Sequence, residues 1–487
     1  MAPRLLSGSN VRSFWSLTLV AASSLFLQTS ALAQTPPPTN GSPSSALDGE
    51  PAARAVTLDE ALAYARTHQP AVVAARARIT AAVAEGDVPR ALWKPTLGVS
   101  AQLFAATANN TTGSYASSMV LDIPRIGATR SVSSVGSAAL QPYATSFVGI
   151  GVGQELFDFG RIAARAAALD ALVDVAKEES SLAVLDLEIQ VRESFYAVLA
   201  AKGVLAASEG AFRRSQVHRD FAKAGVDQGL RPPIELTRAE ADLARFDVGR
   251  IRARGGLRAA QSVLAAAVGV DDLVLDTAGD APSVDDVPSL RDALRRAADR
   301  DPAIREAVAR LKAQEARTKA ISAETRPDVS LTATVSGRAG GAPPTSGEVP
   351  TGSGLLPYVP NWDVGVVFTW PIYDPTVNAR AEASSAHEAV ERAGIEVVKK
   401  EQVAAVQRAY VSLDVARMAL PALDRAFSTA VANSQQADAR FKQGLGTSVE
   451  LADAESLRAR AEIDVALGKF DVARARAQLG RVLAEGL

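Results

Sequence analysis

The sequence contains no cysteine and only three histidines in 487 residues. Without cysteine there is no disulfide framework, no thiolate metal site, no cysteine nucleophile and no lipidated cysteine at the mature N-terminus. The histidines, His68, His218 and His387, are scattered and lack the spacing of a metal-binding pair. We expect each to be a solvated helix residue, and we predict no metal, catalytic or cofactor-binding site.

The chain also lacks an excess of charge of either sign. It has 52 basic and 54 acidic residues, a formal net charge of −2 and no sustained basic block, which argues against a nucleic-acid-binding protein. The stretch GIGVG at 149–153 superficially resembles a phosphate loop, but it opens no helix and no lysine follows it. No GxSxG motif occurs. We therefore predict that the protein is not an enzyme.

Long hydrophobic runs are missing after the N-terminus. Two arginines precede an apolar run at 14–27, and small residues follow at 31–33, which predicts a signal peptide over residues 1–33. An N-terminal membrane anchor would need about 20 apolar residues. Residues 34–54 then form a Pro/Ser-rich linker. No later stretch is apolar enough for a transmembrane helix, so a mature protein in a membrane would cross it as strands.

What the sequence does contain is an internal repeat. QGLRPPIELTRAEADLAR near the middle matches QGLGTSVELADAESLRAR near the end, with Gly229 aligned on Gly444. LDEALAYARTHQPAV, which starts at Leu58, matches LRDALRRAADRDPAI, which starts at Leu290. The repeat predicts halves at 55–269 and 289–487, with a linker at 270–288. Each half reads helix, strand, variable loop, strand, long helix, tip and helix.

Four segments alternate between apolar and polar or small residues, as strands with one apolar face do. They lie at about 97–106, 147–157, 329–337 and 362–373. Trp362 and Trp370 end one apolar face. Eight residues at ~3.3 Å each span about 26 Å, close to the ~25 Å lipid-facing band between the aromatic girdles of outer-membrane barrels. A soluble sandwich would show the same alternation. Four strands cannot close a barrel alone, because the smallest barrels have about eight, so a membrane barrel must be shared between chains.

The helices are too long for an ordinary globular domain. Each repeat contains one of about 65 residues, at 160–227 and 376–442, which corresponds to roughly 100 Å. Part of the hydrophobic pattern is that of a coiled coil. Pro421 predicts a kink or looser packing in the second long helix. Each long helix leads to a tip, at 227–233 or 442–448, where glycine permits a tight reversal. A soluble coiled-coil rod would leave the leader and the strands unexplained.

The duplicated helix starts, the LFDFGR that follows the second strand and the paired Gly-Leu tips together resemble the TolC-type outer-membrane efflux family over residues 55–487. The resemblance implies an α+β membrane protein. It implies a homotrimer in which four strands per chain form a twelve-stranded β-barrel, continued by a long α-helical coiled-coil tunnel in the periplasm. The implied partners are a periplasmic adaptor (membrane fusion) protein, an inner-membrane RND pump or ABC exporter, and the lipid of the cell outer membrane. Many relatives are lipoproteins, whereas a chain without cysteine is not.

The resemblance also points to residues at the tips. It implies that the adaptor contacts Gly229, Leu230, Gly444 and Leu445. The alternative is that the tips are ordinary connections between two helices, which explains the glycines but not the shared leucines. Some relatives carry a tyrosine and an arginine as a latch near the second tip. Phe441 and Gly446 stand there in this chain, so any latch must differ.

Two carboxylates follow the second tip. Glu450 and Asp453 are three residues apart on one helix face, and the resemblance places paired acids at this position towards the periplasmic entrance. Three chains would then bring six carboxylates into a ring that favours cations and binds multivalent metal ions. A solvated helix face is the alternative, since charged residues are usually exposed.

These observations favour an outer-membrane channel of a tripartite efflux or type I secretion system, which conducts substrates from the adaptor and pump to the exterior. A non-transport structural or adhesin-like trimeric surface protein of the outer membrane is one alternative. A soluble periplasmic adaptor is another.

Overall fold

The computed structural model describes residues 54–107, 142–271, 274–279, 287–339 and 359–485. These residues belong to a single unit, Ala53–Leu487. The predicted signal peptide and all but the last residue of the predicted linker that follows it lie outside the described residues.

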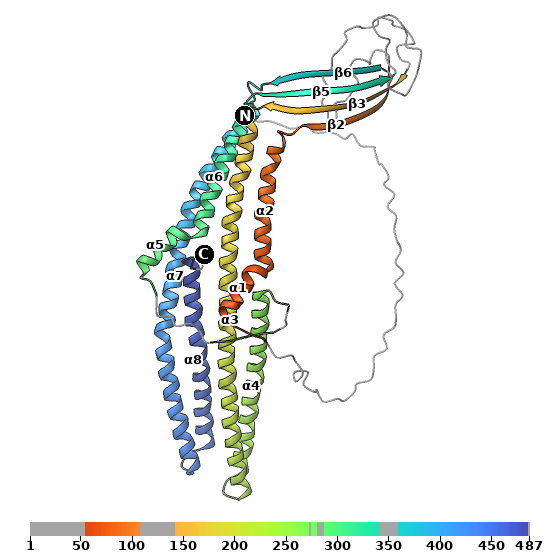
Figure 1. Cartoon of the computed structure of the whole chain (residues 1–487). Helices are drawn as coiled ribbons and strands as arrows, with labels where there is room; N and C mark the ends of the chain where they lie inside the picture. The colour runs from red at the N-terminus through yellow and green to blue at the C-terminus, as the bar shows by residue number, and fades with distance from the viewer. Residues whose placement is uncertain (1–53, 108–141, 272–273, 280–286, 340–358, 486–487) are drawn as a thin grey trace, which may run out of the picture. The chain divides into compact units, whose positions relative to one another are not determined.

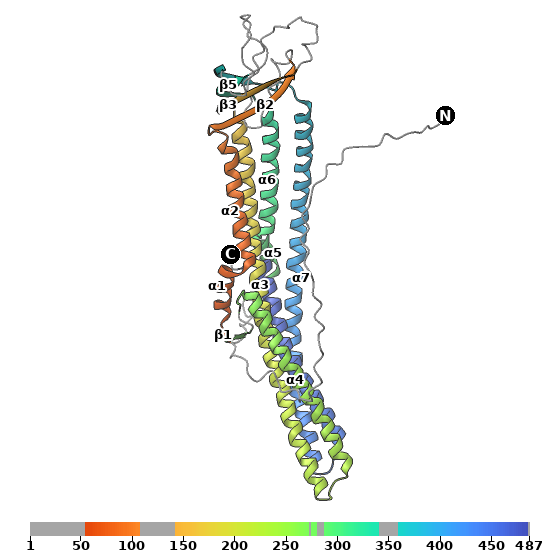
Figure 2. The same ribbon diagram turned by 90° about the vertical axis from the view of Figure 1, so that its right-hand side faces the viewer.

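Most of the described residues are helical (Figure 1). The helices are α1 (Leu58–His68), α2 (Pro70–Ala91), α3 (Arg161–Asp227), α4 (Pro233–Val268), α5 (Leu290–Arg300), α6 (Pro302–Ser322), α7 (Pro375–Lys442) and α8 (Ser448–Val482). Helix α3 packs against α2, α4, α6 and α8, and α7 packs against α5, α6 and α8. Figure 2 shows α4 alongside the lower part of α3 and α2 alongside its upper part.

Each repeat begins with two helices, where the sequence pattern predicts one. Gln69 caps the start of α2, and its side chain accepts a hydrogen bond from the N–H of Ala71. Asp301 caps α6 in the same way. A proline follows each cap as the first residue of the helix. Proline is tolerated there because the backbone N–H at this position would have no partner within the helix, and it keeps the residue before it out of the helical conformation. The chain therefore bends at the same place in both repeats.

The strands form two sheets. The larger is antiparallel in the order β2-β3-β5-β6 and consists of β2 (Thr96–Thr107), β3 (Pro142–Phe157), β5 (Asp328–Ala339) and β6 (Val359–Thr369). The predicted strand 362–373 thus ends early, at Thr369, since Pro371 cannot donate to a ladder. In the smaller sheet, β1 (Arg54–Val56) and β4 (Leu275–Thr277) pair in parallel. This pairing, between the start of the first repeat and the predicted linker between the repeats, was not predicted.

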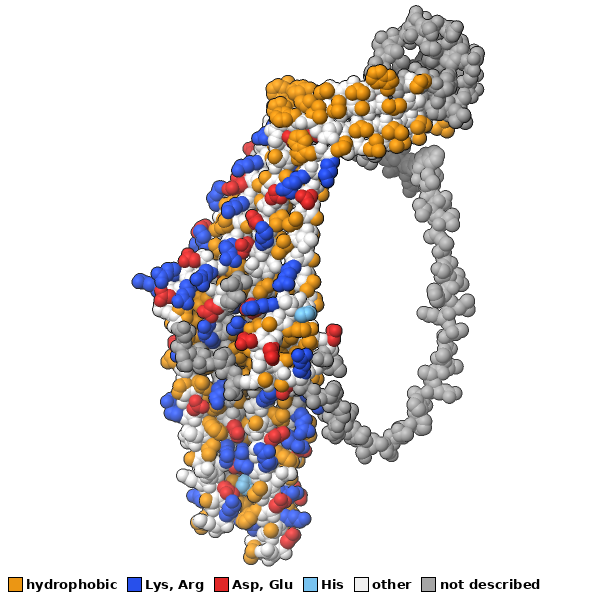
Figure 3. Space-filling model, in the orientation of Figure 1, with side chains coloured by type: hydrophobic (Ala, Val, Ile, Leu, Met, Phe, Trp, Pro, Cys, Tyr) orange, Lys and Arg blue, Asp and Glu red, His pale blue; other side chains and the backbone are white. Residues whose placement is uncertain are grey.

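The large sheet exposes its apolar face. Leu97 and Val364 are 70% and 64% exposed, whereas Ser100 and Thr334 on the opposite face are 7% and 3% exposed. Figure 3 shows hydrophobic side chains gathered over this sheet, with charged side chains over the helices. A soluble sandwich buries the apolar faces of its sheets against each other. The sheet has the opposite arrangement, which suits a surface that faces lipid.

Helix α3 contains an 18-residue stretch with a mean hydropathy of 1.2, and among the described helices it alone is long and apolar enough to cross a membrane by length and composition. The prediction that no stretch after the leader reaches this level was wrong. The stretch is 39% buried, and the core residues Val191, Phe195 and Val198 of α3 are at most 2% exposed. Part of the apolar surface of α3 is therefore used in packing against neighbouring helices.

Helix α7 continues without a break through Pro421. Opposite it, Gly468 of α8 allows close approach, because a Cβ atom at that position would lie 2.5 Å from Cδ1 of Leu423. The kink or looser packing expected at Pro421 stays a prediction.

Candidate functional site at the two hairpin ends

The first hairpin reverses direction between α3 and α4. Gly229 takes a φ of 72°, a left-handed conformation that glycine adopts without strain. The backbone N–H groups of Leu230 and Arg231 both donate to the carbonyl oxygen of Gly225, at 2.8 and 3.1 Å. The side chain of Leu230 is 77% exposed. The turn thus holds a leucine out into solvent.

The second hairpin, between α7 and α8, repeats this geometry. Gly444 has a φ of 74°. The N–H groups of Leu445 and Gly446 donate to the carbonyl oxygen of Arg440, at 2.9 and 3.1 Å. Leu445 is 69% exposed. The four predicted contact residues therefore occupy equivalent positions at the outermost turns, and contact with an adaptor remains a prediction.

An arginine and a glycine exchange places between the two ends. In the first, a Cβ atom at Gly225 would lie 2.7 Å from Cδ of Arg231, so the arginine covers the glycine. In the second, a Cβ atom at Gly446 would lie 3.2 Å from Cβ of Arg440. The same pair therefore occurs in reverse order. As a result, the arginine follows the left-handed glycine in the first end (Arg231 after Gly229) and precedes it in the second (Arg440 before Gly444).

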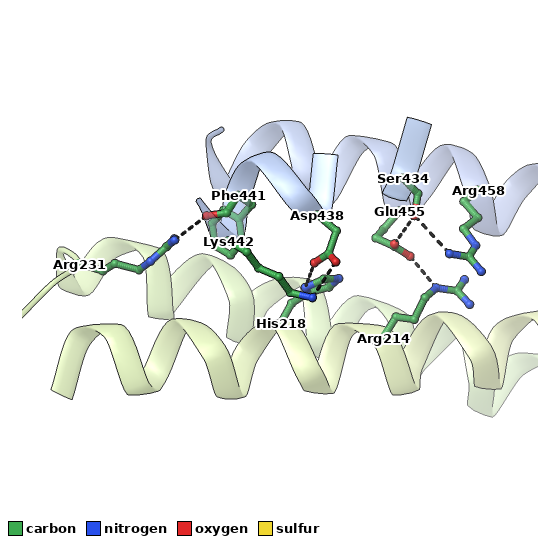
Figure 4. A network of polar contacts seen from close by, with 9 residues as sticks. All are labelled: Arg214, His218, Arg231, Ser434, Asp438, Phe441, Lys442, Glu455 and Arg458. Atoms are coloured by element: carbon green, nitrogen blue, oxygen red, sulfur yellow. Dashed lines mark hydrogen bonds and ion pairs between the residues drawn. The ribbon is translucent and has the colours of Figure 1, made fainter. Parts of the chain in front are cut away.

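This guanidinium ties the first end to the second (Figure 4). Arg231 donates from Nη2 to the carbonyl oxygen of Phe441 at 2.8 Å and from Nη1 to Oε2 of Glu235 at 2.7 Å. Its guanidinium carbon lies 4.0 Å from the centroid of the Phe441 ring and 5.1 Å from that of Phe221. The two rings are themselves in contact, with centroids 5.8 Å apart. The contact combines a charge-assisted hydrogen bond with a cation–π interaction.

A half-buried histidine lies behind this contact. The Nδ1 atom of His218 on α3 is 3.7 Å from Oδ1 of Asp438, whose other oxygen accepts from Nζ of Lys442 at 2.8 Å. The His218 side chain is 18% exposed, so the expectation of a solvated helix residue was wrong here. Burial lowers the pKa of His218, and the negative charges of Glu455 and Asp438 oppose that shift.

A buried carboxylate joins three helices further along the bundle. Glu455 of α8 is 5% exposed. It accepts hydrogen bonds from Nε of Arg214 on α3 at 2.7 Å and from Oγ of Ser434 on α7 at 2.6 Å. Nη1 of Arg458 donates to the same Ser434 hydroxyl at 3.3 Å. Removing one partner would leave a buried charge uncompensated, at a cost of about 3–5 kcal/mol. The network fixes both hairpins against each other.

Glu450 and Asp453 are both exposed at the start of α8. The Glu450 carboxylate accepts from the N–H of Thr447, and Oγ1 of Thr447 accepts from the N–H of Glu450, each at 3.2 Å. This capping box gives Glu450 a local structural role that the T-x-x-E pattern could have revealed. Asp453 makes no hydrogen bond or ion pair within the described parts of the chain. A ring of these carboxylates remains a prediction.

Other predicted residues lie at the large sheet and along the helices. Trp362 and Trp370 are 78% and 52% exposed. Trp362 lies within β6 and Trp370 just beyond its end. His68 and His387 are exposed, as expected. No group of three or more His, Asp or Glu side chains that could hold a metal ion occurs among the residues that the structure describes.

The network residues were missed because their partners are distant in sequence. Arg231 and Phe441 are 210 residues apart, and Arg214 and Glu455 are 241 residues apart. Nothing in the local pattern at Arg231 indicates which side chain it meets. Only the pairing of the two hairpin ends brings these residues together.

The profile of the family described as "Outer membrane efflux protein" matches residues 61–270 and 293–485. The chain belongs to this family. The predicted location of this outer membrane efflux protein, the outer membrane with the helices in the periplasm, is thereby confirmed. The family is one of transport proteins rather than of enzymes.

Solved outer-membrane channels share the fold. The outer-membrane channel OprN matches with a TM-score of 0.65 and 20% identity, over 88% of this chain and 90% of that one. The CmeC outer membrane channel of Campylobacter jejuni matches with a TM-score of 0.67 and 14% identity, over 88% and 86%. The open state of the Neisseria gonorrhoeae MtrE outer membrane channel matches with a TM-score of 0.63 and 19% identity, over 88% and 89%. No curated protein matches the chain.

Proposed function

We propose that three copies of this chain form the outer-membrane channel of a tripartite efflux or type I secretion system. The copies share a twelve-stranded β-barrel, and their helices form a coiled-coil tunnel in the periplasm. Substrates pass through it from a periplasmic adaptor and an inner-membrane RND pump or ABC exporter to the exterior.

The observation that carries the proposal is the sheet with an exposed apolar face and two open edges. Among the described residues, the strand order leaves β2 and β6 with one unpaired edge each. An unpaired edge in lipid leaves backbone groups without hydrogen bonds, at several kcal/mol per group. Each strand in the sheet is antiparallel to its neighbour, so β2 and β6 run in opposite directions. The edge of β6 in one copy can therefore pair antiparallel with β2 of the next, and repetition closes a barrel without an edge.

The hairpin ends support the rest of the proposal. Leu230 and Leu445 are the exposed residues of two equivalent turns, which suits contact with an adaptor that meets each copy twice. Glu450 and Asp453 lie in the first two turns of α8, where three copies would surround the entrance with carboxylates. The solved relatives OprN and MtrE are outer-membrane channels, and MtrE is in an open state.

Disulfide cross-linking tests the assembly, because the chain has no cysteine of its own. Val99→Cys on β2 combined with Val364→Cys or Val366→Cys on β6 should give dimers and trimers on non-reducing gels. Two strands separate β2 from β6 within one copy, so a pair there is ~14 Å apart and cannot form a disulfide. The single-cysteine variants are the controls. If every double-cysteine variant runs only as a monomer, the shared barrel is contradicted.

Conductance tests the transport step. The detergent-purified protein should form ion-conducting pores in planar lipid bilayers. A structural or adhesin-like surface protein of the same fold would insert and assemble without conducting, and that result would favour the alternative function.

A further inference from the structure

Helix α5 differs in charge from its counterpart in the first repeat. α1 and α5 are both 11 residues long and begin at the matching residues Leu58 and Leu290. α5 reads LRDALRRAADR, with four arginines and two aspartates, whereas α1 reads LDEALAYARTH, with one arginine and two acids. Their buried positions agree, because the alanines at the fourth and eighth places of each helix are at most 1% exposed: Ala61, Ala65, Ala293 and Ala297. The two helices thus pack alike and differ on their exposed surface.

The packing of α5 does not require its arginines. All four are exposed, and they stand where α1 has Asp59, Ala63, Tyr64 and His68. A basic residue near a helix C-terminus interacts favourably with the helix dipole. In α5 this position is held by Arg300. The helix dipole does not account for the other three arginines, at positions 291, 295 and 296.

Three of these arginines have no partner within the part of the chain that the structure describes. Arg295 pairs with Asp292 at 2.7 Å, whereas Arg291, Arg296 and Arg300 make no hydrogen bond or ion pair there. Arg291 and Arg295 are four residues apart, as are Arg296 and Arg300. Like charges at this spacing destabilise a helix by a few tenths of a kcal/mol. The arrangement carries a cost that an anionic partner outside the chain would offset.

The position of α5 narrows the choice of partner. Ala293 and Ala297 belong to the same core cluster as Val406 and Leu413 of α7. Val406 is near the middle of α7, roughly 50 Å along the helix from either end. The arginines therefore lie far from the apolar sheet and far from the hairpin ends. Figure 1 shows α5 beside α6 and α7, and Figure 3 shows basic side chains gathered in the same place.

We propose that α5 is a binding surface for the acidic peptides of peptidoglycan, the carboxylate-bearing polymer of the periplasm. The family places the helices in the periplasm, away from lipid headgroups. Arginine is suited to this ligand, because its planar fork donates two parallel hydrogen bonds to a carboxylate. One helix offers a weak site, but the three copies of the proposed trimer would bind the polymer together and gain by multivalency. The surface would hold the channel in the cell wall and is separate from conduction.

Co-sedimentation of the detergent-purified protein with isolated peptidoglycan sacculi tests this surface. The unmodified protein should sediment with sacculi at low salt and be released at high salt. The variant Arg291→Gln/Arg296→Gln/Arg300→Gln should bind about tenfold more weakly, the expected size for three exposed charge pairs. Sacculi whose carboxylates have been amidated should retain little of the unmodified protein.

The matched control is Arg408→Gln/Arg417→Gln/Arg425→Gln, which removes the same charge from exposed arginines of α7. It should sediment as the unmodified protein does. A failure of the unmodified protein to sediment, undiminished binding by the α5 variant, or equal binding to amidated sacculi would each overturn the proposal. Loss of adaptor binding by the α5 variant, with sacculus binding intact, would do the same and assign the arginines to a protein partner. Bilayer conductance of the α5 variant should be unchanged, which separates this test from that of the channel.

Discussion

Arg231 lies across the ring of Phe441 and donates a hydrogen bond to the carbonyl oxygen of the same residue, at 2.8 Å. One side chain thereby joins the end of the first hairpin to the end of α7. Its side chain is 15% exposed, so solvent screens the interaction little. The ends of the two hairpins are therefore coupled within one chain.

We expect Arg231→Ala to uncouple the two ends. A partly desolvated cation–π contact and a charged hydrogen bond together contribute about 2 kcal/mol, which corresponds to roughly 30-fold faster amide exchange at the two turns. Hydrogen–deuterium exchange of residues 225–235 and 438–446 measures this. Arg231→Lys should give an intermediate rate, because lysine keeps the charge but loses the planar fork. Unchanged exchange in the alanine variant would show that the contact contributes nothing to the coupling.

Adaptor contact through the exposed leucines predicts loss of export in Leu230→Asp/Leu445→Asp. Both side chains are more than two-thirds exposed, so the change costs the fold little while placing a charge in an apolar contact. Export in cells should be abolished, with the trimer on native gels and membrane insertion unaffected. Leu172→Asp, the same change on an exposed leucine of α3 far from the ends, is the control. Full export by the double variant would show that the two turns only connect the helices and do not contact the adaptor.

The environment of His218 predicts a pH dependence. Burial lowers the pKa of His218 below its ordinary value of 6.5, so the unfolded region binds more protons than the folded one between the two pKa values. Stability of the hairpin contact is then complete above about pH 6.5 and falls as the pH drops towards the lower, folded pKa. The charged groups that face His218 are Asp438, Lys442, Glu455 and Arg214. Glu235 and Asp242 of α4 line a small pocket together with His218.

Hydrogen exchange around residues 215–222, corrected for intrinsic rates between about pH 5 and 7, measures this effect. His218→Gln should flatten the dependence. His387→Gln, at an exposed histidine of α7, should leave it as in the unmodified protein. If the two variants behave alike, His218 is not the group that titrates.

Periodicity predicted the elements of this fold because helix, strand and glycine patterns are local. The two long helices and the turns at Gly229 and Gly444 lie where the sequence placed them, within a residue or two. The pairing of β1 with β4 was missed because it joins two very short segments, one before the first repeat's helices and the other before those of the second. The link from Arg231 to Phe441 was missed because it too joins distant parts of the chain. The duplication predicted that the two ends would be alike, but the exchange of arginine and glycine between them produces a contact that has no counterpart in the other end.

The proposed carboxylate ring at the entrance calls for a substitution that removes charge without removing the helix cap. Glu450 accepts a hydrogen bond from the N–H of Thr447, and glutamine can take the same place in a capping box. Glu450→Gln/Asp453→Asn therefore deletes the charges and keeps the start of α8. Glu450→Ala would also lose the cap, at about 1 kcal/mol, and would confuse the two effects.

We expect the Glu450→Gln/Asp453→Asn channel to be less cation-selective than the unmodified one and to be blocked less by multivalent cations in planar bilayers. Three copies would bring six carboxylates around one opening, where a ring of like charge concentrates cations. Asp453 has no partner within the described residues, so its charge is available to the opening, whereas that of Glu450 is partly engaged in the cap. Asp453→Asn alone should therefore account for most of the change. If selectivity and block are the same in both variants as in the unmodified channel, the two carboxylates are a solvated helix face.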